Sequence, residues 1–102
     1  MTWLEGKTRN PKRPGARLRE LLDRPEILGV PGAHNALAGL LAKEQGFECL
    51  YVSGGGVTLT LGLPDLGIMG LDELSFITRM LSRATDLPLI VDGDVGYGGT
   101  LN

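Results

Sequence analysis

Cysteine is nearly absent from this chain of 102 residues, and aromatic residues make up only 5% of it. The single cysteine, Cys49, excludes an internal disulfide and favours a reducing compartment, so we expect a cytoplasmic protein. The apolar runs are short, and none approaches the roughly 20 apolar residues of a membrane span. The first residues also lack the basic-then-apolar order of a signal peptide. We therefore expect no membrane partner.

The net charge of −2 is unevenly distributed along the chain. Residues 1–24 carry seven basic and three acidic side chains, whereas residues 25–102 carry three basic and nine acidic ones. A basic segment can indicate nucleic-acid binding, but the only aromatic residue there that could stack on a base is Trp3. We therefore expect no nucleic-acid partner, and we interpret residues 1–13 as a flexible arm that leads into a helix.

Apolar spacing divides residues 14–102 into alternating helices and short buried strands. Leucines at helical spacing, with proline, glycine or aspartate at the ends, predict helices over 14–23, 34–46 and 72–84. Uniformly apolar runs predict strands over 27–30, 49–52 and 88–92. This order indicates an α/β fold, with a parallel sheet covered by helices. Both a doubly wound sheet and a (β/α)₈ barrel fit, and three strands are an incomplete version of either, since a closed barrel takes about 250 residues.

Two aspartates, Asp92 and Asp94, follow the last predicted strand and are separated by Gly93. Strand alternation would turn both side chains to the same side, at the sheet edge where parallel α/β folds bind ligands. Two carboxylates at that edge suit Mg²⁺, which takes one or two carboxylates and keeps several waters. A pair of solvated or capping aspartates in a turn is the alternative interpretation.

A second polar segment, Ser53-Gly54-Gly55-Gly56, follows the preceding strand and is predicted to be a loop. Successive backbone N–H groups of glycines can hold a carboxylate or phosphate, although an ordinary flexible turn fits equally well. The later glycine-rich run, GDVGYGG, does not have the spacing of a dinucleotide-binding or Walker motif.

Three further side chains are candidates for chemistry. Tyr51 lies two residues before Ser53, so its phenol would face the same cavity as a hydrogen-bond donor or proton carrier, or it would pack in the core. Asp65 lies in a loop with apolar neighbours, where helix capping or a turn is the alternative. His34, the only histidine, follows the first predicted strand and could act as a base or mark a helix entry.

Three segments together resemble the isocitrate lyase and phosphoenolpyruvate mutase superfamily, and most closely its 2-methylisocitrate lyase branch. They are LYVSGGG at 50–56, LGLPDLG at 61–67 and LPLIVDGDVGYG at 87–98. The opening Trp3-Leu4 and the segment PGAHNA at 31–36 support that branch. The resemblance implies the N-terminal part of a Mg²⁺-dependent (β/α)₈ barrel enzyme, with Mn²⁺ as a possible substitute. It further implies cleavage of 2-methylisocitrate to pyruvate and succinate by a carbon–carbon lyase of propionate metabolism.

The resemblance also implies individual roles. Ser53, Gly54 and Gly55 match the stretch that holds the substrate's pyruvyl carboxylate. Asp92 matches a metal ligand and Asp94 a metal-associated acid. Asp65 matches an acid near the metal, and Tyr51 matches an active-site tyrosine that assists proton handling. The small-molecule substrate is then a carboxylate, and the full-length relative is a homotetramer.

The family's proton donor is a cysteine in a Lys-Lys/Arg-Cys-Gly-His loop, which would lie beyond Asn102, and Cys49 does not match it. We therefore expect the 102-residue chain to be inactive alone, as part of a longer enzyme. Two alternatives stay open. One is another activity of the superfamily: phosphonomutase, phosphonopyruvate hydrolase or oxaloacetate decarboxylase. The other is a non-catalytic fragment that pairs with a partner.

Overall fold

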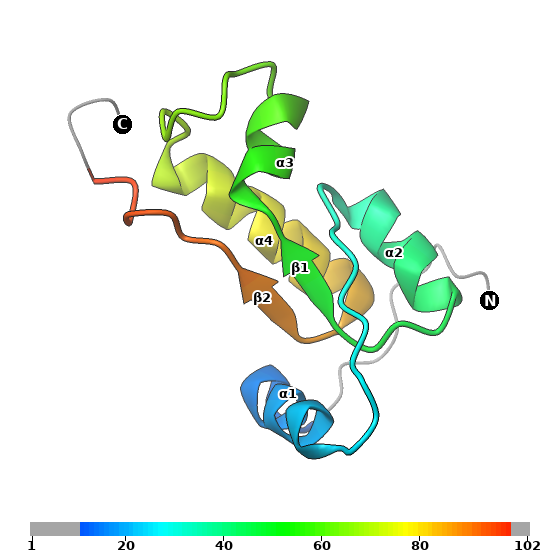
Figure 1. Ribbon diagram of the computed structural model, residues 1–102. Coiled ribbons are helices and arrows are strands. Elements are labelled where there is room, and N and C mark those ends of the chain that lie inside the picture. Colours follow the sequence, from blue (N-terminus) through cyan, green and yellow to red (C-terminus); the bar gives the residue numbers. More distant parts are fainter. Residues whose placement is uncertain (1–10, 99–102) are drawn as a thin grey trace.

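The computed structural model describes residues 11–98, which form four helices and two strands (Figure 1). In chain order these are α1 (Pro14–Asp23), α2 (Ala36–Glu44), β1 (Leu50–Val52), α3 (Gly54–Thr60), α4 (Leu71–Thr85) and β2 (Leu89–Val91). The two strands pair in parallel, with Leu50 opposite Leu89 and Val52 opposite Val91. Two helices connect them, so the described part is an α/β arrangement, as predicted. Residues 1–10 of the predicted flexible arm lie outside the described residues.

The strand predicted over residues 27–30 is wrong. Ile27 is 99% exposed, and pairing with β1 begins only at Pro31, whose carbonyl accepts a hydrogen bond from the Tyr51 N–H at 2.9 Å. The Ala33 N–H then donates to the Tyr51 carbonyl at 2.9 Å, which gives one isolated parallel bridge. Pro31 has no N–H with which to extend the ladder backwards. The described residues therefore contain two strands and one extended segment beside β1.

The loop predicted for residues 53–56 is also wrong, because this segment begins helix α3. The Ser53 hydroxyl oxygen accepts a hydrogen bond from the Gly56 N–H at 3.2 Å and caps the helix. Val57 and Thr58 are buried on the inner side of the helix. Glycine disfavours helices by up to about 1 kcal/mol per residue. Here the cap and the burial of the following turn outweigh that preference.

The core lies between β1 and the helices that cover it. Helix α4 packs against both α2 and β2, and its Leu81 is fully buried. Cys49 is fully buried as well, as expected of a core cysteine. The main cluster of buried apolar side chains consists of Ala33, Leu50, Val52, Val57, Met69, Leu74, Leu81 and Tyr97. Within residues 11–98, no helix is both long enough and apolar enough to cross a bilayer.

Helix α1 lies beside the amino ends of the strands (Figure 1). Pro14 occupies its first turn, as predicted, and Leu21 is its only buried residue. Ion pairs attach it to the rest of the molecule. Arg17 approaches Asp86 at 3.6 Å, and Arg24 contacts Glu48 at 2.9 Å. The helix is therefore attached mainly through charged side chains, away from the ends of the strands where the aspartates lie.

Helix α2 offers a direct test of local stability. The Asn35 side-chain oxygen accepts a hydrogen bond from the Ala38 N–H at 2.8 Å, which caps the helix. We expect Asn35→Ala to lower the free energy of unfolding by about 1 kcal/mol, because that amide loses its partner. Thermal unfolding followed by circular dichroism measures the change. Asn35→Asp keeps a capping acceptor and is expected to retain stability, and an equal loss in both variants would contradict the capping role.

Candidate functional site

The carboxyl ends of β1 and β2 lie side by side because the strands are parallel neighbours (Figure 1). Tyr51 stands in β1, and Asp92 follows β2 directly. The Tyr51 hydroxyl donates a hydrogen bond to Asp92 Oδ2 at 3.2 Å. The structure thus brings together two candidates that are 41 residues apart in the sequence, at the edge where the site was predicted.

Asp94 reaches the same edge by a different route from the one predicted. Its N–H donates to Asp92 Oδ1 at 3.0 Å, so the backbone turns immediately after the strand. Asp94 has a φ of 47°, in the left-handed region, and strand alternation no longer applies to it. Its carboxylate lies against the backbone of Gly67, where an added Cβ would stand 3.1 Å from Asp94 Oδ2. The two aspartates are therefore placed by a turn rather than by the pleat of a strand.

Asp65 enters the site from the loop between α3 and α4. Its carboxylate lies beside Gly55, and a Cβ added at Gly55 would be only 3.0 Å from Asp65 Oδ2. Glycine at this position is what lets the acid approach the start of helix α3. The same loop carries Gly67, which adjoins Asp94. The loop therefore brings Asp65 to the strand ends, where the sequence placed it only by resemblance.

Tyr97 is a member of this cluster that the sequence interpretation missed. Its ring is buried, with 6% exposure, and its hydroxyl lies 3.0 Å from the position that a Cβ on Gly54 would occupy. Tyr97 has a φ of 56°, and Gly96 before it has a φ of 97°, so the chain folds back after β2. The available signal was a lone aromatic residue inside the glycine-rich run GDVGYGG.

Burial and negative charge shape the electrostatics of both tyrosines. Burial, then the charge of Asp92 and the hydrogen bond to it, raise the pKa of Tyr51. Burial, followed by the charges of Asp94, Asp92 and Asp65, raises the pKa of Tyr97. Both phenols are therefore protonated at neutral pH and can donate hydrogen bonds. The charges of all three carboxylates contribute to raising the pKa of Tyr97.

These carboxylates suit a hard divalent cation. Within residues 11–98, no three histidine, cysteine, aspartate or glutamate side chains are close enough together to hold a metal by themselves. Mg²⁺ does not need three, because it takes one or two carboxylates and keeps several waters. In the described part of the chain, Asp65, Asp92 and Asp94 form no ion pair, so their negative charge has no protein counter-ion. The donor set therefore fits Mg²⁺, with Asp92 and Asp94 as the candidate ligands.

The segment predicted to be an anion-binding loop has a different structure from the one expected. Ser53, Gly54 and Gly55 form the entry to helix α3, and Ser53 uses its hydroxyl oxygen as a cap. Gly54 is buried against Tyr97, whereas Gly55 faces Asp65. A cavity of about 110 Å³ is lined by Gly32, Ala33, His34, Ser53 and Gly56. His34 is exposed there.

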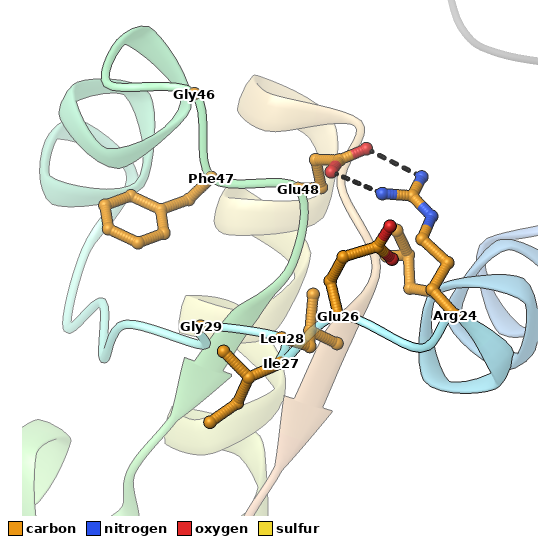
Figure 2. Close-up of a pocket in the computed structure, with 9 residues that line it drawn as sticks. Arg24, Glu26, Ile27, Leu28, Gly29, Gly46, Phe47 and Glu48 are labelled. Carbon is orange, nitrogen blue, oxygen red and sulfur yellow. Dashed lines mark hydrogen bonds and ion pairs between the residues drawn. The ribbon is translucent and has the colours of Figure 1, made fainter.

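A larger hollow, of about 520 Å³, lies at the opposite end of the strands (Figure 2). Ile27, Phe47 and the ion pair between Arg24 and Glu48 line it. The hydrogen bond and charge of Arg24 lower the pKa of Glu48. Both polar side chains are thus already paired with each other, and none of the three aspartates lines this hollow. The candidate site is accordingly the edge that follows β1 and β2.

Comparison with known proteins assigns the chain to a family. The chain belongs to the phosphoenolpyruvate phosphomutase family, whose model matches residues 18–102. It is 47% identical over 102 residues to 2-methylisocitrate lyase of Bacillus subtilis (strain 168), covering all of this chain and 34% of that protein. The superfamily resemblance inferred from the three segments is therefore confirmed.

Solved structures of the same superfamily also match. The phosphoenolpyruvate phosphomutase from Streptomyces platensis subsp. rosaceus is 36% identical with a TM-score of 0.79, over 84% of this chain and 30% of that one. A phosphonopyruvate hydrolase in complex with oxalate and Mg²⁺ is 28% identical with a TM-score of 0.72, over 79% and 29% of the two chains. The chain thus spans about a third of the length of the curated relatives it matches.

Proposed function

We propose that this chain forms part of a Mg²⁺-dependent carbon–carbon lyase that cleaves 2-methylisocitrate to pyruvate and succinate. The observation that carries the proposal is the convergence of Asp65, Asp92 and Asp94 beyond the carboxyl ends of two parallel strands. In parallel α/β folds this edge is where ligands bind. The 47% identity to a 2-methylisocitrate lyase supports the choice of substrate. In the whole protein, the described elements would belong to a (β/α)₈ barrel.

In the proposal, different residues bind the metal, bind the substrate and assist proton transfer. Asp92 and Asp94 would hold Mg²⁺, with Asp65 nearby. When bound, the ion supplies a positive charge that stabilises the oxyanion developing on the substrate. Ser53, Gly54 and Gly55 would hold the pyruvyl carboxylate. The Tyr51 phenol donates a hydrogen bond to Asp92 Oδ2 at 3.2 Å. It would orient the Asp92 carboxylate and assist proton handling.

The reaction also needs an acid that protonates the departing succinate carbanion. Cys49 cannot supply it, because its side chain is fully buried and burial raises the pKa of its thiol. In the proposal the acid belongs to the Lys-Lys/Arg-Cys-Gly-His loop implied by the family resemblance. We therefore expect the 102-residue chain to release no pyruvate from 2-methylisocitrate by itself. The full-length protein would act as a homotetramer.

A second candidate is phosphonate chemistry at the same site. The structural match to a phosphoenolpyruvate phosphomutase, at a TM-score of 0.79, favours it. Both candidates use a small carboxylate and Mg²⁺, so the three aspartates serve either one. They differ in the bond that breaks: a carbon–carbon bond in the lyase, and a carbon–phosphorus bond in the mutase or hydrolase, where the phosphoryl group passes to an oxygen acceptor.

A chimera separates the two candidates. Residues 1–102 would replace the matching third of the Bacillus subtilis 2-methylisocitrate lyase, with the relative supplying the rest. We expect the chimera to release pyruvate from 2-methylisocitrate with Mg²⁺, measured by coupling to lactate dehydrogenase. The chimera carrying Asp92→Asn should lose at least about 100-fold in rate. A folded chimera that turns over phosphonopyruvate but not 2-methylisocitrate would overturn the lyase proposal.

A further inference from the structure

The fold places Tyr97 in an unusual position for an aromatic residue. Its backbone is left-handed, with a φ of 56°, a conformation that costs a bulky residue about 1 kcal/mol or more. The ring belongs to the main cluster of buried apolar side chains. This packing holds the ring and fixes the direction of the hydroxyl group. The phenol is therefore rigidly positioned before any ligand arrives.

The hydroxyl of Tyr97 points to the acid-lined edge of the sheet. It lies next to Gly54, because a Cβ there would stand 3.0 Å from the phenol oxygen and 3.9 Å from Asp92 Cγ. The residue is 94% buried, but its hydroxyl oxygen still reaches solvent at this edge and makes no hydrogen bond to any residue in the described range. A phenol that is held by its ring and has no protein partner is free to donate its hydrogen bond to a ligand.

We propose that the Tyr97 hydroxyl is a ligand-binding group, which donates a hydrogen bond to a carboxylate oxygen of the small acid that binds with Mg²⁺ beside Asp92. This inference rests on the proposed function. A donor in addition to residues 53–55 suits this position, because the three aspartates at this edge can only accept hydrogen bonds when ionised. Tyr51 cannot donate a hydrogen bond to the ligand while its hydroxyl donates to Asp92. Tyr97 is the remaining phenol at this edge.

Oxalate serves as the probe, since a relative binds oxalate with Mg²⁺. We would titrate oxalate into the ¹⁵N-labelled 102-residue chain with Mg²⁺ present and follow the amide signals of Gly54 and Gly55. Tyr97→Phe keeps the ring and removes only the hydroxyl. We expect it to weaken oxalate binding about tenfold, the effect of losing one hydrogen bond to a charged group. Its melting temperature and its Mn²⁺ affinity, measured by electron paramagnetic resonance, should stay unchanged.

Gly54→Ala provides a second, independent variant. Its methyl group would press on the phenol oxygen, so it should weaken oxalate binding in the wild type more than in the Tyr97→Phe background. Equal oxalate affinities in the wild type and Tyr97→Phe would overturn the inference and leave the proposed function standing. A lower melting temperature or weaker Mn²⁺ binding in Tyr97→Phe would overturn it by assigning the hydroxyl to the fold or the metal. Failure of the wild type to bind oxalate with Mg²⁺ would overturn the metal and ligand site proposed for this chain, on which the inference rests.

Discussion

Asp92→Asn is expected to weaken Mn²⁺ binding by the 102-residue chain at least about 100-fold, as measured by electron paramagnetic resonance. Asp92 is the residue on which the site converges. One of its oxygens accepts from the Asp94 N–H at 3.0 Å and the other from the Tyr51 hydroxyl at 3.2 Å. These two contacts orient the carboxylate but leave a lone pair on each oxygen for a metal. The substitution removes the negative charge while the shape of the side chain is kept.

Two comparison variants sharpen this test. Asp94→Asn should also reduce Mn²⁺ affinity, because in the proposal its carboxylate is the second metal ligand. Asp23→Asn changes an exposed aspartate at the end of α1, away from the carboxyl ends of the strands, and should leave Mn²⁺ affinity unchanged. If Asp92→Asn binds Mn²⁺ as tightly as the Asp23 variant does, the aspartates are a solvated turn and the metal assignment fails.

Gly39→Ala is expected to lower the free energy of unfolding by up to about 2 kcal/mol. Gly39 lies where α2 crosses α4, and an added Cβ would be 2.6 Å from Leu81 Cδ2 and 3.0 Å from Thr85 Cγ2. Both neighbours are fully buried, so neither side chain has space to move away. Overpacking of this kind costs about 1–3 kcal/mol, which exceeds the gain of about 1 kcal/mol from replacing a helical glycine.

Gly15→Ala is the matched control for this prediction. Gly15 also lies in a helix, but an added Cβ there meets nothing within 4 Å. The same substitution should therefore stabilise the protein by about 0.5–1 kcal/mol, because the unfolded chain loses freedom. Urea unfolding of both variants measures the two free energies. A Gly39→Ala variant as stable as Gly15→Ala would mean that the helix crossing is looser than the structure indicates.

The sequence predicted much of the site, but only as separate pieces. Asp92 and Asp94 follow a strand, Tyr51 precedes the end of another, and both placements hold in the structure. Asp65 and Tyr97 could not be placed this way, because both lie in irregular segments whose course depends on distant contacts. Asp65 approaches Gly55 from ten residues further along the chain, and Tyr97 approaches Gly54 from 43 residues further along. Spacing within a sequence carries no information on such approaches.

The alternation of apolar strands with amphipathic helices was determined by the sequence itself. So were the helix starts at Pro14 and Asn35 and the left-handed end of α2 at Gly46, which has a φ of 96°. Local chemistry suffices for these features, because proline, a capping side chain and glycine act within one turn of backbone.

Only the tertiary structure decided the rest. It turned residues 53–56 into the start of α3, since burial of Val57 outweighs the poor helix propensity of glycine. It left residues 27–30 outside the sheet, with Ile27 99% exposed and pairing with β1 beginning only at Pro31. And it carried Tyr97 into the core beside the aspartates. These outcomes depend on packing and pairing between distant segments, which no local preference encodes.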